Sequence, residues 1–259
     1  MTSEQPEIVE FGEIYAHAVT LEDAIQRIVD RVDSGVGGYV VTPNVDHICI
    51  AEYDEQLRSA YKGAFLSLPD GQPLIWMARL FGTPLPAKVS GSDLVLPLLM
   101  AAGERRQSVY FVGSTESVCE AAANRIARAA PGLKIVGWSC PRFDPSSLDT
   151  SEIDRAIEAV RVAKPSLVLV ALGNPKQEYF MARYEARYHP AVALGVGATL
   201  DFIAGSVARA PVWMQQAGLE WVYRLVREPG RLWRRYLVRD RAIVGIFLRT
   251  RARAVRSAR

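Results

Sequence analysis

The sequence predicts an α/β protein: a Rossmann-like, mostly parallel sheet flanked by helices, followed by a basic helical C-terminal appendage. Short apolar runs without polar alternation, such as residues 167–172, are typical of strands buried on both faces. Amphipathic stretches separate these runs, and single helices between strands imply right-handed crossovers and parallel pairing. A chain of 259 residues, 49% of them hydrophobic, can bury the core of one large domain or two smaller ones.

Strand character is expected first at residues 8–18, before a helix that begins at Thr20. Thr20 and Asp23 have the spacing of a capping box, in which each side chain bonds the other residue's backbone N–H. Apolar residues then recur at helical spacing, and the glycines within residues 34–38 end the helix.

Two short buried strands are expected next, at residues 39–41 and 64–68. The first is followed by Thr42 and Asn44, and the second is followed by Asp70. Open α/β sheets bind ligands outside the carboxyl ends of their strands, so these polar side chains are expected to face one crevice.

Asp70 is the acid that the sequence singles out. It lies between Pro69 and Gly71 in a tight turn, where a rigidly held carboxylate is a candidate general base. The alternative is an Asx turn or a helix cap. Asp46 and Asp201 also lie near strand ends, and the same structural alternative applies to both.

A third loop, at residues 88–93, precedes a helix expected at residues 94–102. Ser92 or Asp93 is expected to cap this helix. The chain turns polar at residues 103–107, which we interpret as a soft subdomain boundary.

The second half repeats a strand–helix pattern. Strands are expected at residues 108–113, 134–136, 167–172 and 191–196, and helices are expected up to residue 128, at residues 152–163, after residue 175 and from Pro211 through residue 227. Proline is favoured at the first position of a helix, and Pro229 with Gly230 is expected to end the last one.

Glycine turns follow three of these strands. Gly113 and Ser114, the turn from Gly173 to Glu178, and the turn at Gly197 expose backbone N–H groups. Such groups at a helix N-terminus bind phosphate, although a single strand-to-helix glycine is often structural. Three such turns at one sheet edge predict the floor of a phosphate or nucleotide site.

Charge is distributed unevenly along the chain. Residues 224–259 contain 12 arginines against two acids, a net charge of +10, and since the whole chain carries +3 the remainder carries −7. We therefore divide the chain into a core of residues 1–223 and a basic appendage of residues 224–259.

The appendage also has apolar residues at helical spacing. They are Leu232, Tyr236, Ile243 and Phe247, with Trp233, Leu237, Val244 and Leu248 beside them. Such a segment either docks on its own body or lies in the interface of an anionic membrane. Membrane association is expected, because the stretch from Arg249 onward adds charge with no core to join. Nucleic-acid binding is not expected, since the body is acidic and carries no recognisable binding module.

Other composition features favour a reduced cytoplasmic setting and no metal. Cys49, Cys119 and Cys140 lack metal-ligand spacing, and the acidic, polar start is unlike a signal peptide. The three histidines are scattered, and no D-x-D pair is present. No cofactor is expected.

Several motifs together resemble the WecG/TagA/CpsF family of bacterial glycosyltransferases over most of residues 10–236. They are T-P-N at residues 42–44, P-D-G at 69–71, V-S-G-S-D at 89–93, Y-F-V-G at 110–113, A-L-G-N-P-K-Q-E at 171–178, G-V-G-A-T-L-D-F at 195–202, R-A-P at 209–211 and G-L-E-W-V-Y-R-L at 218–225. Their order along the chain makes a chance match improbable.

The resemblance implies an inverting, metal-independent transfer of a sugar from a UDP-sugar to a polyprenyl-diphosphate-linked sugar at the cytoplasmic membrane face. Asp70 would be the base, with Thr42 and Asn44 beside it. The nucleotide-sugar would be held by Lys88, Gly113, Ser114, Gly173, Pro175, Gln177, Glu178, Gly197 and Asp201, and the diphosphate or acceptor by Arg209, Arg224, Arg231 and Arg234.

Two departures and two alternatives complete the prediction. Lys88 stands where the family often has arginine, so the charge is kept but the two-pronged hydrogen bonding of a guanidinium to a donor phosphate is lost. The loop at residues 138–143 also lacks the expected glycine-rich form. One alternative is a nicotinamide-dependent oxidoreductase, which would lack the dinucleotide fingerprint. The other is a non-enzymatic adaptor that binds membrane or nucleic acid through its basic tail.

Overall fold

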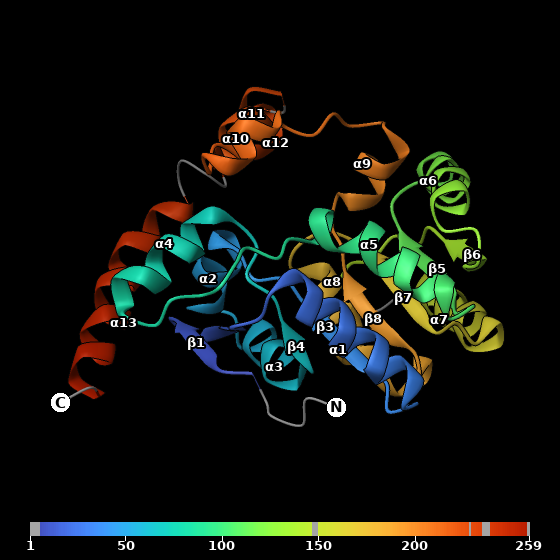
Figure 1. The fold of residues 1–259 in the computed structure, drawn as a ribbon, viewed down its shortest axis with the longest axis horizontal. Coiled ribbons are helices and arrows are strands. Elements are labelled where there is room, and N and C mark those ends of the chain that lie inside the picture. Colours follow the sequence, from blue (N-terminus) through green and yellow to red (C-terminus); the bar gives the residue numbers. More distant parts are fainter. Residues whose placement is uncertain (1–5, 147–149, 228, 235–238, 258–259) are drawn as a thin grey trace.

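A six-stranded parallel sheet forms the centre of the molecule, with strand order β4-β3-β8-β7-β5-β6 (Figure 1). The computed structural model describes residues 6–146, 150–227, 229–234 and 239–257, without the side chains of residues 231, 232, 234 and 253–257. The strands are β3 (Gly38–Val41), β4 (Leu66–Ser67), β5 (Ser108–Gly113), β6 (Lys134–Ser139), β7 (Leu167–Ala171) and β8 (Val192–Gly195). The predicted α/β class is confirmed.

Helices cover both faces of the sheet and produce two apolar cores. One core contains residues of α1 (Leu21–Asp33), α5 (Gly91–Glu104), α6 (Glu116–Ala129) and α9 (Thr199–Ala204). The other contains residues of α2 (Val45–Ala51), α3 (Glu55–Gly63), α4 (Gln72–Phe81), α7 (Ser151–Ala163) and α8 (Lys176–Tyr188). Because β3, β7 and β8 are covered on both faces, their residues are almost all buried, as their unbroken apolar sequences predict.

An antiparallel hairpin of β1 (Ile8–Phe11) and β2 (Ile14–His17) accounts for the strand character at residues 8–18. It covers the short edge strand β4: the Ser67 backbone N–H donates to His17 Nδ1 at 2.9 Å, and Ser67 Oγ donates to the Tyr15 carbonyl at 2.5 Å. Covering an edge strand in this way protects it from pairing with another chain. The helix that follows begins with the predicted capping box of Thr20 and Asp23.

The structure corrects the start of α5. The helix begins at Gly91, and Ser90 is its N-cap residue, in place of Ser92 or Asp93. The Ser90 carbonyl accepts the backbone N–H groups of Asp93 and Leu94, at 3.0 and 2.9 Å. The Asp93 carboxylate is unavailable for capping because Ser90 Oγ donates to it at 2.6 Å and cationic side chains contact it.

The single helix predicted from Pro211 through residue 227 is also wrong. The structure has α10 (Val212–Gln216) and α11 (Glu220–Arg227), separated at Gly218. Gly218 adopts a φ of +69°, which side-chain-bearing residues rarely adopt, and a Cβ there would lie 2.8 Å from the Trp76 ring. A third short helix, α12 (Pro229–Arg234), begins at the proline that was expected to end the preceding helix. We call α10, α11 and α12 the cap (Figure 1).

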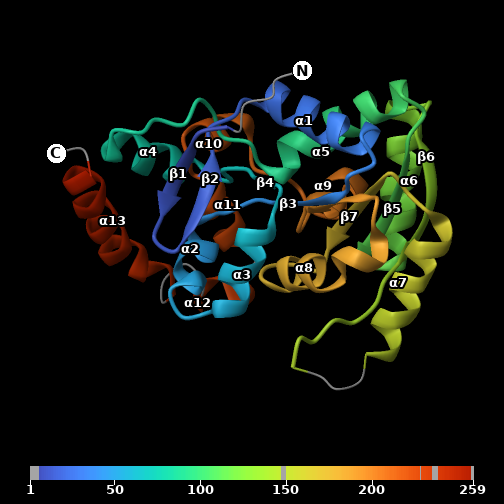
Figure 2. The same ribbon diagram turned by 90° about the horizontal axis from the view of Figure 1, so that it is seen from below.

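The last helix, α13 (Ile243–Ser257), follows the 3₁₀ turn η2 (Asp240–Ala242) and docks on the body, as Figure 2 shows beside β1 and α2. Ile246 is 2% exposed, and Phe247 stacks on Phe81 with ring centroids 5.3 Å apart. Thr250 accepts the Gly12 backbone N–H at 3.1 Å. The expectation that this stretch has no core to join is therefore wrong for Arg249, which contacts Glu52, and for Thr250, which is buried. Two residues of the predicted apolar stripe, Tyr236 and Leu237, lie outside the described residues.

Strands from both sides of residues 103–107 belong to the one sheet, since β3 pairs with β8. The soft boundary there, and the division of the chain at residue 224, stay predictions.

Candidate active site

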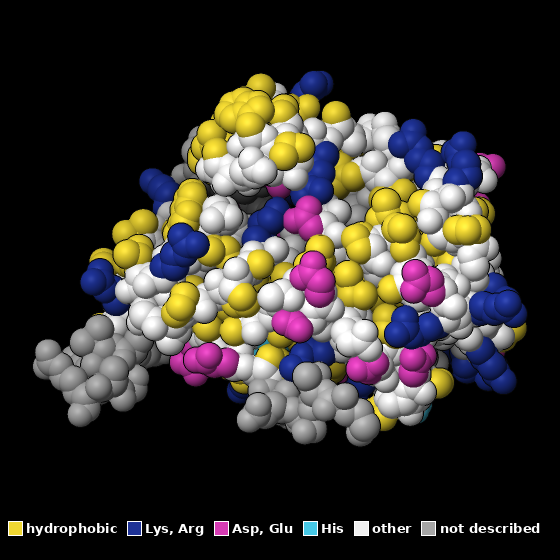
Figure 3. Space-filling view, in the orientation of Figure 1, with side chains coloured by type: hydrophobic (Ala, Val, Ile, Leu, Met, Phe, Trp, Pro, Cys, Tyr) yellow, Lys and Arg dark blue, Asp and Glu magenta, His cyan; other side chains and the backbone are white. Residues whose placement is uncertain are grey.

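A cavity of about 860 Å³ lies at the carboxyl edge of the sheet. Residues that follow β3, β4, β7 and β8 line it, including Thr42, Asp70, Gly173 and Gly197. Helices α4 and α13 and the cap contribute its other walls, and Figure 3 shows the surface hollowed beneath the cap. Ligand sites in proteins occupy about 300–1,000 Å³, so the cavity has room for a nucleotide-sugar-sized molecule.

Asp70 is held rigidly at this cavity. Its backbone N–H donates to the Pro43 carbonyl at 2.8 Å, and Gly71 follows with a φ of +104° before α4 begins. Burial raises the pKa of the Asp70 carboxyl, and the charge of Glu220 raises it further, against the opposing effects of Lys88, His47 and a hydrogen bond from Asn44. A carboxylate with a raised pKa accepts a proton more readily than an ordinary aspartate.

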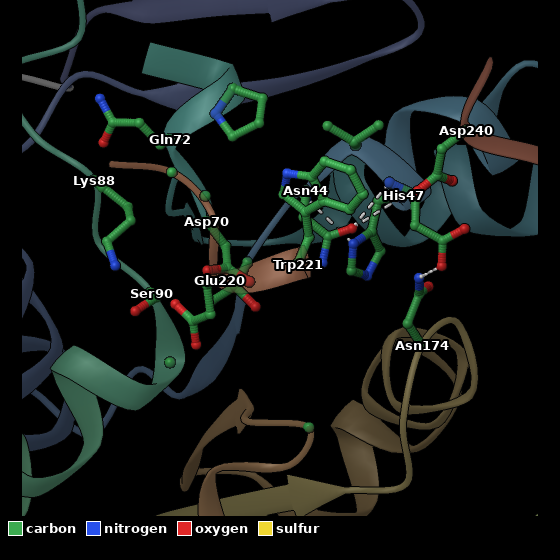
Figure 4. A pocket seen from close by; sticks show the side chains of 18 of the residues that line it. Asn44, His47, Asp70, Gln72, Lys88, Ser90, Asn174, Glu220, Trp221 and Asp240 are labelled. Carbon is green, nitrogen blue, oxygen red and sulfur yellow. Dashed lines mark hydrogen bonds between the residues drawn. The ribbon is translucent and has the colours of Figure 1, made fainter. Parts of the chain in front are cut away.

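A buried network positions Asn44 beside this carboxylate. Asn44 Oδ1 accepts the backbone N–H groups of Asp46 and His47 at 3.1 and 3.3 Å and so caps α2. The Asn44 backbone N–H donates back to His47 Nδ1 at 3.3 Å, and His47 Nε2 lies 3.2 Å from Glu178 Oε1. Glu178 and His47 are both buried, so the imidazole and the carboxylate lie side by side away from water. Figure 4 shows Asn44 and His47 at one side of the pocket.

Gln177 joins two of the glycine turns. Its Nε2 donates to Glu178 Oε1 at 2.9 Å, and its Oε1 accepts the Gly197 backbone N–H at 3.0 Å. Thr42 is bonded to the same strand end, since its Oγ1 donates to the Gly195 carbonyl at 3.4 Å. The turns after β3, β7 and β8 are therefore tied together by side chains.

Charged residues alternate from Lys88 to Glu220, which both line the cavity, through Asp93 and Arg209, which lie outside its lining. Lys88 Nζ lies 2.8 Å from Asp93 Oδ2, and Arg209 Nη2 lies 2.6 Å from Asp93 Oδ1. Arg209 Nε also lies 3.7 Å from Glu220 Oε1. These contacts lower the pKa of the Asp93 carboxyl, although burial raises it, so Asp93 stays ionised between the two cations.

The sequence of this chain matches one known protein family. The profile described as the glycosyl transferase WecG/TagA/CpsF family matches residues 9–257. The chain belongs to this family. It is accordingly a glycosyltransferase, so the oxidoreductase and adaptor alternatives are set aside.

Two characterised relatives are similar over most of their length. One, from Bacillus spizizenii, is 33% identical over 223 residues, covering 86% of this chain and 84% of the relative. The other, from Bacillus subtilis, is 32% identical over 206 residues, covering 80% of this chain and 77% of the relative. Both are named N-acetylglucosaminyldiphosphoundecaprenol N-acetyl-beta-D-mannosaminyltransferase.

The structure brings many of the predicted site residues of this glycosyltransferase to one cavity. Those that line it are Thr42, Asn44, Asp70, Lys88, Gly173, Gln177, Gly197 and Arg224. Those outside its lining are Gly113, Ser114, Pro175, Glu178, Asp201 and Arg209. Of these, Glu178 and Arg209 contact lining residues, whereas Asp201 lies on α9 and its backbone carbonyl accepts Ser206 Oγ at 3.1 Å.

Of the arginines predicted to bind the diphosphate or acceptor, Arg224 lies in the cavity lining. Arg224 lines the cavity from α11, and its Nε is buried without a hydrogen-bond partner among the described residues. A buried guanidinium nitrogen without a partner fits an anion as ligand. The side chains of Arg231 and Arg234 lie outside the described part of the chain.

Sequence reasoning missed His47 and Arg239 as lining residues, and it named Asp46 only as an acid near a strand end. His47 was set aside because histidines are scattered, yet the first turn of α2 places it in the site. Asp46 Oδ2 accepts Asn174 Nδ2 at 2.7 Å, and Arg239 Nη2 lies 2.5 Å from Asp46 Oδ1 (Figure 4 shows the Asn174 contact). The polar residues after the T-P-N turn were a usable signal for Asp46 and His47, whereas nothing local marks Arg239.

The described residues contain no group of three or more His, Cys, Asp or Glu residues arranged to hold a metal ion. Nor does any helix among them combine the length and apolar character needed to cross a membrane.

Proposed function

We propose that this glycosyltransferase moves a sugar, with inversion and without a metal, from a UDP-sugar to a polyprenyl-diphosphate-linked N-acetylglucosamine. The names of the two Bacillus relatives support this acceptor. The observation that carries the mechanism is the position of Asp70, whose half-buried carboxylate, with a raised pKa, lines a cavity large enough for both substrates' reacting ends. The product would enter a cell-surface polysaccharide.

In the proposed step, Asp70 accepts the proton of an acceptor hydroxyl. The hydroxyl oxygen forms a bond to the anomeric carbon of the donor sugar as the bond from that carbon to the UDP oxygen breaks. UDP leaves with the electron pair, and the new linkage forms on the opposite face of the sugar. Asn44 orients the Asp70 carboxylate through its hydrogen bond, and Thr42 lies in the same wall.

We assign the glycine turns to the nucleotide. The Gln177 side chain makes hydrogen bonds to Glu178 and Gly197, so its proposed role is to fix the turns around the donor. Gly173 has a φ of +76° and open space beside its Cα, which lets a ligand approach the backbone closely. Gly113, Ser114, Pro175 and Asp201 stay expectations of the family resemblance.

Positive charge would stabilise the departing diphosphate. Arg224 has the unpartnered nitrogen described above, Lys88 also lines the cavity, and Arg209 contacts the lining residue Glu220. Arg231 and Arg234 are assigned to the same task by resemblance. Cations aimed at charge that develops in the transition state stabilise it more than the ground state.

We also propose that the protein works at the cytoplasmic face of the membrane as a peripheral protein. Apolar side chains are exposed on α4 and α13 beside the cavity: Trp76 is 45%, Leu80 56%, Val244 63% and Leu248 59% exposed. The appendage adds basic residues, each contributing about 1 kcal/mol near an anionic surface. Replacing Val244 and Leu248 by serine is expected to reduce sedimentation with anionic vesicles, and unchanged sedimentation would contradict the assignment.

Asp70→Asn tests the base. Transfer is expected to fall by about 10²–10⁴-fold, the usual contribution of a positioned general base. UDP binding, measured by calorimetry, is expected to persist because the amide keeps the shape of the side chain. Asp30→Asn, on the exposed face of α1, is the matched control and should leave turnover unchanged. Normal turnover by Asp70→Asn would refute the base assignment, and stabilisation by NAD in place of UDP would refute the donor class.

A further inference from the structure

Glu220 is a second carboxylate at the site of Asp70. It lies in the first turn of α11, in the cap, whereas Asp70 follows β4 in the body. Both line the same cavity, and Figure 4 shows their side chains next to one another with Lys88 on one side. Their separation in the sequence means that only docking of the cap brings them together.

Among the residues that the structure describes, the contact with Arg209 leaves the Glu220 carboxylate with unused hydrogen-bonding capacity. Its ion-pair contact, with Arg209 Nε, is long at 3.7 Å, and its side chain is 27% exposed. Arg209 makes its shorter contact with Asp93, at 2.6 Å through Nη2, so its closer ion pair is with Asp93 and not with Glu220. A carboxylate accepts about four hydrogen bonds through its two oxygens, which leaves Glu220 able to bind donors in the cavity.

Sugar hydroxyls are such donors. A carboxylate beside a catalytic base can accept the hydroxyl next to the reacting one and so fix the orientation of the sugar ring, because charged acceptors make the stronger hydrogen bonds. Helix-terminal acids have a plainer role too, since a glutamate in the first turn of α11 interacts favourably with the helix dipole. The position of Glu220 beside Asp70, in the lining of the same cavity, points beyond that role.

We propose that Glu220 is an acceptor-positioning residue, which takes a hydrogen bond from an acceptor-sugar hydroxyl adjacent to the one that Asp70 deprotonates. This inference rests on the proposed function. Since Glu220 belongs to the cap, it also makes the proton affinity of Asp70 depend on the cap being in place, because the charge of Glu220 favours protonation of its neighbour.

The test is Glu220→Gln in the full-length protein, with a UDP-sugar and a soluble diphosphate-linked N-acetylglucosamine. The acceptor KM is expected to rise about tenfold, since a charge-assisted hydrogen bond becomes a neutral one. The donor KM should not change. The acid limb of the pH–rate profile should move to lower pH, because loss of the Glu220 charge removes one cause of the raised Asp70 pKa. Glu158→Gln, exposed on α7, removes the same charge at a distance and is the matched control.

The outcomes separate this inference from the proposed function. If the wild-type protein transfers no sugar to the acceptor analogue, the proposed function fails first. If it does, and Glu220→Gln keeps the wild-type acceptor KM and acid limb, the Glu220 inference alone is overturned. A purely structural role predicts a lower melting temperature with unchanged KM and pH profile. If Glu220→Gln does not fold, Glu220→Asp should fold and show a raised acceptor KM with an unshifted acid limb, and a wild-type KM there overturns the inference.

Discussion

Replacement of Ile246 by alanine tests whether the basic C-terminal helix is part of the folded body. Ile246 is 2% exposed and belongs to the same apolar core as β1, α2 and α4. Truncating a buried isoleucine to alanine costs about 2–5 kcal/mol, because it removes transferred apolar surface and leaves a cavity. Val244, two residues earlier in α13, is 63% exposed, and its replacement by alanine should stay within about 0.5 kcal/mol.

The assay is urea unfolding of the two variants and the wild type, followed by circular dichroism. Because Ile243 and Phe247, its neighbours on α13, line the cavity, Ile246→Ala should also lower transfer. Val244 lines the cavity too, so Val244→Ala is the control for stability alone. If α13 opens without the rest of the protein, hydrogen exchange will show loss of protection confined to residues 243–257.

Equal effects of the two substitutions would refute the reasoning. An unchanged midpoint for Ile246→Ala would mean that α13 is not packed on the body in solution. The basic helix would then be free to lie on a membrane along its whole apolar face, as the sequence alone suggests.

Three further predictions concern titration and buried bonds. The kcat/KM of transfer should fall on the acid side at a pH above 3.8, the ordinary aspartate value, because Asp70 must be ionised and its pKa is raised; an acid limb at or below 3.8 contradicts this. Burial lowers the His17 pKa from 6.5 to about 4, so the unfolded chain binds more protons between these values. Stability measured by urea unfolding should therefore be complete above pH 6.5 and fall toward pH 4, and His17→Gln, which still accepts the Ser67 N–H, should lose this dependence. Finally, Glu178→Ala should lower the free energy of unfolding by about 2–4 kcal/mol, since the buried Gln177 amide loses its acceptor and the His47 imidazole loses the carboxylate beside it; a neutral result in thermal melting would show that Gln177 finds another partner.

Much of the fold could be predicted because its signals are local. The unbroken apolar run of β7 requires cover on both faces, and the Thr20–Asp23 spacing specifies a helix start in a few residues. The positions of Thr42 and Asp70 at neighbouring strand ends followed from parallel pairing, since β3 and β4 end at the same edge.

The errors arose where contacts distant in sequence decided the local structure. Ser90 replaces Asp93 as the α5 cap because Lys88 and Arg209 occupy the Asp93 carboxylate. The helix after Pro211 is interrupted at Gly218, where the chain passes against Trp76. The periodicity of each segment does not reveal these contacts, because the contacting residues come from other parts of the chain.

The sequence by itself determined the class of fold, the family and the acid at the centre of the proposed chemistry, because these depend on periodicity and on motifs of a few residues. Tertiary structure decided which charges surround that acid. Glu220 reaches Asp70 only when the cap is docked, and His47 meets Glu178 only across the sheet edge. Burial and charge–charge distances are properties of the folded chain, so the proton affinity of Asp70 and the docking of α13 could be read only from the structure.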